Sequence, residues 1–315
     1  MNQEAKRHKS IGDISSFSER KTVYDYKMIK LELSSACNAH CQFCTMFYNK
    51  NKAKDFLSVN NALSFIKLNA AYLNENDIKI EPFFNGESLL NPDFFTIINI
   101  ILNEGCQLGE FDTNLGLDID IEKLASLPFS CVTVNIGGTN EDVHQKIMGT
   151  SFKLVCDNLR KIMESPKRKF SLFVKMNPVA DNIHQIDTLD AFVSQFGNGI
   201  NWKAQQTGIP VPKDLTKDEL INAYKKIYSK NQEKYFRFTI QDDFSIIAKN
   251  QNCIYLCNCI NANGMLTLCA HDQLRHLNLG NAFVRPVSEI MESKAYKSAM
   301  SFAKMRKLDF CKGCN

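Results

Sequence analysis

Three cysteines lie close together near the N-terminal end of the chain, in the segment SSACNAHCQFCTM. Cys37, Cys41 and Cys44 form a C-x3-C-x2-C triplet. Thiolates bind zinc or iron–sulfur clusters, and a structural zinc site usually takes four protein ligands. His40 could complete a zinc set, but it lies between two of the thiols on one short loop. A four-iron cluster held by three cysteines leaves one iron open, so the triplet favours a cluster with a free coordination position.

The composition agrees with metal-binding cysteines in a reducing compartment. A chain of 315 residues, 44% hydrophobic and 23% charged, can bury a large core. The first thirty residues lack an apolar signal segment, and no apolar run approaches the roughly 20 residues of a membrane span. We therefore expect a cytoplasmic protein whose 12 cysteines stay reduced. The net charge of +4 is spread thinly, so neither nucleic acid nor a membrane is expected as a partner.

The order of apolar patterns predicts an α/β domain after a polar N-terminal arm over residues 1–26. Short β-type runs then alternate with helical periods as far as about residue 206, which is typical of βαβ units. Strands are expected near 28–34, 78–85, 108–113, 131–136, 170–177 and 200–206, and helices over 58–73, 94–103, 120–127, 150–164 and 183–196. This alternation fits a doubly wound sheet and a barrel equally well. A linker with Pro210 and Pro212 and a helix over 217–231 follow.

Polar and apolar residues alternate within the strands themselves. Val132 and Val134 alternate with Thr133 and Asn135, and KLELS, LFVKMN and INWKAQ show the same period. A parallel sheet covered by helices on both faces should instead read as continuously apolar. The alternation favours a wide barrel with a polar lumen, although a sheet with one solvent-exposed face is the alternative. The inner polar positions would be Glu32, Lys175, Asn177, Lys203 and Gln205.

Together these features resemble the radical S-adenosylmethionine (SAM) enzymes, whose hallmark is this triplet after the first strand of a partial (β/α)6 TIM-like barrel. The resemblance covers about residues 28–206 and implies that Cys37, Cys41 and Cys44 hold a [4Fe–4S] cluster whose open iron binds SAM. It also implies SAM-binding roles for Phe43, Gly86, Glu87, Asn114, Asn135 and Asn182. The segment Asn85-Gly86-Glu87-Ser88 resembles the family's Gly-Gly-Glu-Pro. The chain departs from the family pattern at Asn85, Ser88, Asn135, Gly137 and Met148, where Gly, Pro, Ser, Asp and Arg are common.

The C-terminal cysteines resemble a second family feature, the SPASM domain in its shortened Twitch form. Cys253 is followed by ten residues, a glycine, four residues and Cys269, and Cys311 and Cys314 end the chain. The resemblance implies that these four bind an auxiliary [4Fe–4S] cluster, so the chain would divide into a 27–208 barrel and a 209–315 linker, helix and Twitch domain. Cys257 and Cys259 compete with Cys253 for the first ligand position, and a structural zinc site is the alternative for the whole set.

A hairpin is expected in the same region. The segment INANGMLTLC reads as two short strands around Asn263-Gly264, a pair that favours a type I′ turn. Such a hairpin would bring Cys269 back beside the segment that carries Cys253.

The resemblance implies an enzyme that cleaves SAM and uses a 5′-deoxyadenosyl radical to abstract hydrogen. We expect an oxidoreductase that dehydrogenates a hydroxylated small molecule, sugar- or aminocyclitol-like, with the auxiliary cluster as electron acceptor and a flavodoxin- or ferredoxin-type reductant as partner. Lys175 and Lys203 are the candidate catalytic bases. Epimerisation or dehydration would use the same ligands.

Two other functions are considered. The first is modification of a peptide or protein, although the 26 polar N-terminal residues leave no room for a leader-binding domain, which favours a small molecule. The second is a non-enzymatic iron–sulfur or zinc protein, which would not need Phe43, Gly86, Glu87 and a polar lumen together.

Overall fold

The computed structural model describes residues 27–41, 43–44, 46, 54–177, 179, 181–204, 238–240, 246–248, 256–269, 272, 277–305 and 307–308. The expected N-terminal arm and the expected 217–231 helix lie outside these residues, as do Gln205, Cys253, Cys311 and Cys314. Within them, no helix is long and apolar enough to cross a membrane.

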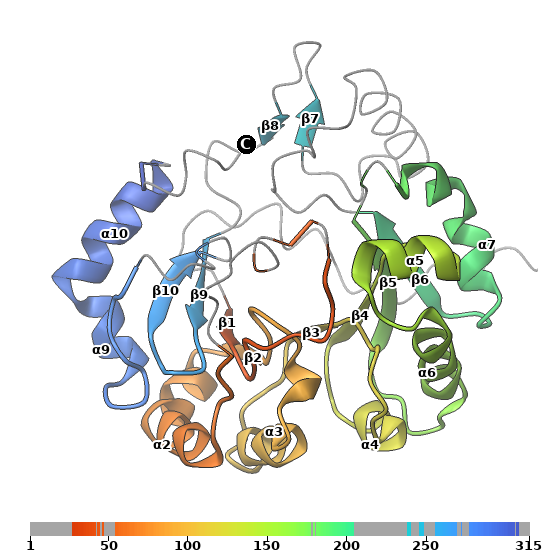
Figure 1. Cartoon of the computed structure of the whole chain (residues 1–315). Helices are drawn as coiled ribbons and strands as arrows, with labels where there is room; N and C mark the ends of the chain where they lie inside the picture. The colour runs from red at the N-terminus through yellow and green to blue at the C-terminus, as the bar shows by residue number, and fades with distance from the viewer. Residues whose placement is uncertain are drawn as a thin grey trace, which may run out of the picture.

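Six parallel strands form the centre of the fold. They are β1 (Met28–Leu31), β2 (Lys79–Glu81), β3 (Glu110–Thr113), β4 (Cys131–Ile136), β5 (Ser171–Met176) and β6 (Ile200–Ala204). β1 pairs with β2, and β3 to β6 pair in chain order. An isolated parallel bridge between Ile80 and Leu108 joins the two groups. The helices lie outside the curved strands (Figure 1), so the expected partial barrel is confirmed.

Most of the connecting helices follow the expected patterns, but the helix over 141–148 was not among the expected ranges. The connecting helices are α2 (Val59–Glu75), α3 (Phe94–Asn103), α4 (Ile121–Ala125), α5 (Glu141–Met148), α6 (Phe152–Glu164), the 3-10 helix η5 (Ile183–Thr188) and α7 (Leu189–Ser194). Side chains of Ser58, Asp120, Asn140 and Ser151 cap their helices by accepting a backbone N–H three residues later. The helix expected over 183–196 is therefore η5 followed by α7. β2 ends before Pro82, well short of the expected residue 85, because proline cannot donate to the ladder.

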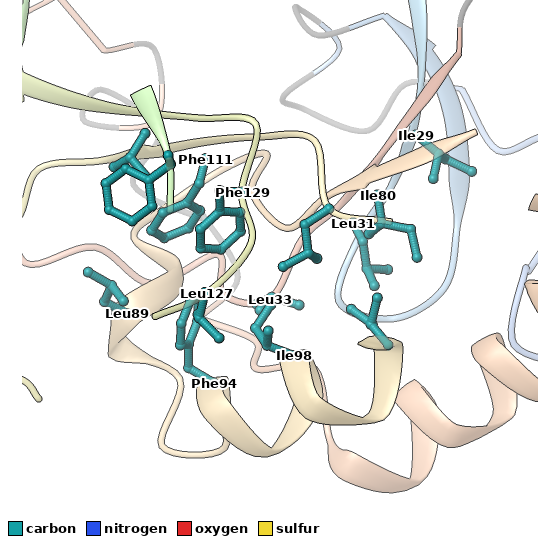
Figure 2. Packing of buried hydrophobic residues seen from close by; sticks show 14 of the residues in the cluster. Ile29, Leu31, Leu33, Ile80, Leu89, Phe94, Ile98, Phe111, Leu127 and Phe129 are labelled. Carbon is teal, nitrogen blue, oxygen red and sulfur yellow. The ribbon is translucent and has the colours of Figure 1, made fainter. Parts of the chain in front are cut away.

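The apolar residues of the strands form the core between sheet and helices. In Figure 2, Leu31, Leu33 and Ile80 lie over Ile98 and Phe94 of α3. The Phe111 and Phe129 rings stack with centroids 5.0 Å apart. Val132, Val134, Ile136, Leu172, Val174 and Met176 belong to the same core. Since strand side chains alternate between faces, the intervening polar residues lie on the inner face, as the alternation predicted.

The C-terminal segment adds a hairpin to the same sheet. β9 (Leu256–Ile260) pairs antiparallel with β10 (Leu266–Cys269) and parallel with β1, which gives the order β10-β9-β1-β2. The hairpin is thus confirmed, but the turn type is wrong: Gly264 has φ +89° whereas Asn263 lies outside the positive-φ region that type I′ requires. β7 (Phe238–Ile240) pairs with β8 (Ile246–Ala248), and α9 (Val287–Glu292) and α10 (Lys294–Lys304) follow the hairpin. Sequence patterns had not indicated α9 or α10.

Candidate cluster, cofactor and substrate site

The cysteine triplet lies on the loop that follows β1, and none of its thiols is in a disulfide. Burial, together with the charges of Cys37 and Cys44, raises the pKa of the Cys41 thiol. Two N–H groups approach the Cys37 sulfur, from the Ala39 backbone at 3.4 Å and the Asn114 amide at 3.9 Å. Crowded thiols of this kind become thiolates only beside compensating positive charge, which iron supplies.

The three thiols of the triplet are not arranged as a site for a single metal ion. Among the residues that the structure describes, no three Cys, His, Asp or Glu side chains are grouped so that they could hold a single metal ion. In a four-iron cluster each cysteine binds a different iron, so the sulfurs stand farther apart than the ligands of one ion. Hydrogen bonds to the sulfur, such as those to Cys37, are also characteristic of cluster ligands.

Gly86 fixes the segment after β2 against the start of the cluster loop. Its φ is +66°, and a Cβ at this position would lie 2.4 Å from the Ala36 carbonyl oxygen. The next residue, Glu87, donates its backbone N–H to the same oxygen at 2.8 Å. Only glycine combines this backbone conformation with so close an approach. The residue before the first cluster cysteine is therefore placed by the Gly86 turn.

The buried carboxyl group of Glu87 ties this turn to the end of β3. It accepts hydrogen bonds from the backbone N–H groups of Leu89 (3.2 Å) and Asn114 (2.7 Å) and from the Thr113 hydroxyl (2.9 Å). Burial nevertheless raises the pKa of Glu87 to about 7. A carboxylate offers about four lone-pair sites, so one remains for a further donor. The structure thus gives Glu87 mainly a bracing role.

Two asparagines continue this network toward the cluster. The amide of Asn114 donates to Asn38 Oδ1 at 2.8 Å, and Asn38 donates to the Gly116 carbonyl at 3.0 Å. Asn135, on the inner face of β4, donates to the Thr113 carbonyl at 3.2 Å. Sequence patterns did not single out Asn38, because a partner 76 residues away leaves no local signal.

Asn182 braces the loops after β4 and β5. Its fully buried amide donates to the carbonyls of Gly137 and Asn177, each at 2.9 Å, and accepts the Val179 N–H at 2.7 Å. This side chain is already engaged with backbone groups, so its contribution to a cofactor site is to hold the two loops together.

An apolar floor supports the cluster loop. Ala39, Ile147, Met148 and Val179 form a small buried cluster, against which Phe43, Cys37 and Cys41 pack. Met148, where the family commonly has Arg, is therefore part of a packing surface at the end of α5. The backbone N–H of His40 also donates to the Met148 carbonyl at 2.7 Å.

Two buried asparagines have polar atoms that no described group satisfies. They are both amide atoms of Asn85, beside Gly86, and the Oδ1 of Asn177, just after β5. Only 2% and 3% of these residues is exposed, and an unmet buried polar group costs about 1–3 kcal/mol. Because each stands at the carboxyl end of a strand, these atoms fit a ligand such as SAM or a substrate.

Deeper in the lumen, Lys30 is surrounded by acceptors. Its ammonium lies 2.6 Å from Glu81 and 3.7 Å from the centre of the Phe83 ring. Burial by itself would lower the pKa of Lys30, but Glu81, Cys257 and Cys259 outweigh it and raise that pKa. Lys30 therefore stays charged.

A second ion pair lies on the inner face of the barrel, between β3 and β5. Lys175 of β5 lies 2.5 Å from Asp112 of β3. Burial alone would raise the pKa of Asp112, but the charges of Lys175, Lys203 and Lys30 lower it. An ammonium that donates to an ionised carboxylate has no lone pair to accept a proton. The arrangement thus suits Lys175 to binding, which differs from the base role expected of it, and the lowered pKa makes Asp112 a weak base.

The other polar positions expected inside the barrel are placed as follows. Lys203 lies beside Lys175 in the β5–β6 register, with its ammonium 5.4 Å from the centre of the Phe173 ring. Glu32 is buried and accepts the Ala262 N–H at 3.1 Å, which ties the end of β1 to the C-terminal hairpin.

Of the proposed auxiliary-cluster ligands, only Cys269 lies within the described residues. It is buried at the end of β10, while Cys257 and Cys259 lie on β9 with their sulfurs 3.3 Å apart. Burial raises the pKa of the Cys259 thiol, and the neighbouring Cys257 and Cys269 raise it further. Three thiols therefore gather in this hairpin, and the choice among Cys253, Cys257 and Cys259 stays open.

Comparisons with known proteins agree with this geometry. Residues 252–315 match SPASM, described as an iron–sulfur cluster-binding domain. Streptococcus suis SuiB bound to S-adenosylmethionine is similar in structure, with a TM-score of 0.63, 15% identity and coverage of 87% of this chain and 68% of that one. The structure of anSMEcpe with bound AdoMet has a TM-score of 0.64 and 15% identity, and the match covers 91% of this chain and 84% of that one. The structure of BtrN in complex with AdoMet and 2-DOIA has a TM-score of 0.52 and 16% identity, and the match covers 92% of this chain and 93% of that one. No curated protein matches the sequence.

These similarities establish the fold. They confirm the expected partial barrel, and the SPASM match confirms the expected iron–sulfur cluster-binding domain in the C-terminal part of the chain.

Proposed function

We propose that this chain is a radical SAM enzyme in which Cys37, Cys41 and Cys44 hold a [4Fe–4S] cluster. The observation that carries the proposal is the braced arrangement of the triplet with Gly86, Glu87 and the following strand ends. SAM, when bound to the reduced cluster, supplies a 5′-deoxyadenosyl radical that takes hydrogen from a substrate. The AdoMet-bound structures of anSMEcpe and BtrN support the choice of cofactor.

The chain's own residues would bind and orient SAM from the strand ends. The unsatisfied amide of Asn85 and the remaining lone pair of Glu87 suit the amino and carboxylate groups of an amino acid. Asn114, just after β3, links Asn38 and the Cys37 sulfur beside the site, and Asn135 offers an amide from β4. Phe43 adds an aromatic surface, and Asn182 holds the β4 and β5 loops around the site.

We propose that the substrate is a polar, hydroxylated small molecule that is oxidised by two electrons. Support comes from the charged lumen, where Lys30, Glu81, Asp112, Lys175 and Lys203 act on one another. Lys175 and Lys203 are candidate substrate-binding groups, and Asp112 holds the Lys175 ammonium in place. BtrN, which covers 92% of this chain, is seen with 2-DOIA.

The auxiliary cluster would take the second electron. Cys253, Cys269, Cys311 and Cys314 are its proposed ligands within the SPASM match, with Cys257 or Cys259 as alternatives for the first. A flavodoxin- or ferredoxin-type protein would reduce the first cluster. A cytoplasmic setting, where thiols stay reduced, suits both clusters.

Modification of a peptide is the second candidate function. SuiB is seen with precursor peptide SuiA (TM-score 0.64) and anSMEcpe with the Cp18Cys peptide (0.63), and both scores exceed the 0.52 of BtrN.

Iron content and SAM cleavage test the main proposal. Anaerobically reconstituted protein should contain about eight irons, four for each cluster. Replacement of Cys37, Cys41 and Cys44 by Ala should lower this to about four and abolish 5′-deoxyadenosine release under dithionite. Cys156→Ala, a buried thiol on α6, is the matched control and should change neither. Persistent 5′-deoxyadenosine release from the triple variant would refute the proposal.

A further inference from the structure

Among the described residues, three lysine ammonium groups face the lumen, and two of them are already paired. Lys30 is bound to Glu81 and Lys175 to Asp112. Lys203 forms no ion pair with any described carboxylate, and its ammonium lies 5.4 Å from the centre of the Phe173 ring. Glu110, at the deeper end of β3, and Lys203 both influence the Cys131 thiol, but they do not pair with each other. Lys203 is thus the lumen lysine that has no carboxylate partner in the described part of the chain.

Asn177 supplies a second polar group one step closer to the cofactor end. Residues two apart on a strand share a face, so Asn177 follows Lys175 on the inner face of β5, and Lys203 lies beside Lys175 in the β5–β6 register. The Oδ1 atom of Asn177 is buried and has no hydrogen-bond partner in the described part of the chain. An unsatisfied acceptor and a lysine without a described carboxylate partner therefore lie on neighbouring strands, on either side of Lys175 along the inner face.

We infer that the substrate carries an anionic group, a carboxylate or a phosphate, and a hydroxyl at a different position. Lys203 binds the anion, and the Asn177 side chain accepts the hydrogen bond of the hydroxyl. The inference rests on the proposed function for the reaction that follows, but binding itself depends only on these two side chains. A substrate whose nearest group is an amine is disfavoured, because its ammonium would face Lys203 and Lys175.

Three small probes separate the alternatives: glycerate, glycerol 3-phosphate and glycerol, which share hydroxyls and differ in charge. Their binding to the reconstituted, SAM-loaded full chain is measured by anaerobic calorimetry. We expect at least one anion to bind more tightly than glycerol, and the stronger of the two identifies the carboxylate or phosphate class. Lys203→Met should lower the affinity for that anion by about tenfold or more, whereas Lys203→Arg should retain most of the affinity.

Matched controls make the result specific. Lys153→Met removes an exposed lysine of α6 and should leave anion binding unchanged. Asn177→Ala should lower the affinity for glycerate or glycerol 3-phosphate. It should not change the affinity for inorganic phosphate, which carries no carbon-bound hydroxyl. Equal binding of glycerol and both anions, or unchanged anion binding by Lys203→Met, would overturn the inference.

The two proposals can fail separately. Absence of 5′-deoxyadenosine release from the wild-type protein would refute the proposed function while leaving charge-selective binding measurable. Conversely, normal SAM cleavage with no preference for anions would remove only the assignment of the substrate class.

Discussion

The buried carboxyl group of Glu87 should make the stability of the metal-free protein fall as pH rises. Burial raises its pKa from 4.5 to about 7 in the folded chain. A carboxyl group with a raised folded pKa stabilises the fold below its unfolded pKa, and this contribution is lost as pH increases through the folded value. The 2.5-unit difference corresponds to about 3 kcal/mol, of which roughly 2.5 kcal/mol falls between pH 5 and 8.

Glu87→Gln isolates this effect, because glutamine keeps the shape and does not titrate. The free energy of urea unfolding is measured for both proteins at pH 5, 6, 7 and 8, so that all other titrating groups cancel in the difference. Glutamine also turns an N–H toward the Asn114 N–H, which costs about 1–3 kcal/mol at every pH. The wild type should therefore lose roughly 2.5 kcal/mol relative to the variant across the range. A pH-independent difference would refute the assignment of a raised pKa.

Three further predictions concern the supports of the site. Gly86→Ala should displace the cluster loop and lower the iron content by about four irons per chain. Gly197→Ala is the control, because Gly197 also has a positive φ but no atom lies within 4 Å of an added Cβ, and this variant should keep its full iron content. Equal iron content in the two variants would contradict the close-approach argument. Asp112→Asn and Lys175→Met should show a coupling of about 1–2 kcal/mol in a double-mutant unfolding cycle, and additive effects would show that their ion pair contributes nothing. Burial lowers the pKa of His144 to about 4, so its contribution to the free energy of unfolding should fall by about 2 kcal/mol from pH 7 to 5. His144→Gln should remove this loss. If the free energy of unfolding of the variant depends on pH as steeply as that of the wild type, His144 is not a buried neutral histidine.

Local patterns were sufficient to predict the six barrel strands and most of the helices between them, although not α5, α9 or α10. The polar–apolar alternation in VTVNI fixed which residues of β4 enter the core, and the helix Phe94–Asn103 was predicted to the residue. Such patterns are readable because each depends on neighbours a few positions away. The 183–196 segment and the Asn263-Gly264 turn show the limit, since η5 and the non-I′ turn depend on their tertiary surroundings.

The cysteine spacing alone determined the candidate chemistry, because the ligands of the first cluster lie within eight residues of one another. The groups around them depend on strands that are distant in sequence. The Asn38–Asn114 contact joins the loop after β1 to the end of β3, and the Asp112–Lys175 pair spans 63 residues. A base role for Lys175 followed from residue type alone, and only its position 2.5 Å from an ionised carboxylate indicated binding instead.

The sequence by itself therefore determined the thiol triplet, the strand periodicity and the second group of cysteines, all of which are properties of short segments. The tertiary structure decided which polar groups meet inside the barrel and that β9 continues the sheet beside β1. It also decided that Lys30 and Lys175 on the inner face of the barrel have carboxylate partners, whereas Lys203 has none among the described residues. The physical reason is that hydrogen bonds and ion pairs are set by distance in space, and the parallel arrangement of strands brings together residues that sequence separation keeps apart.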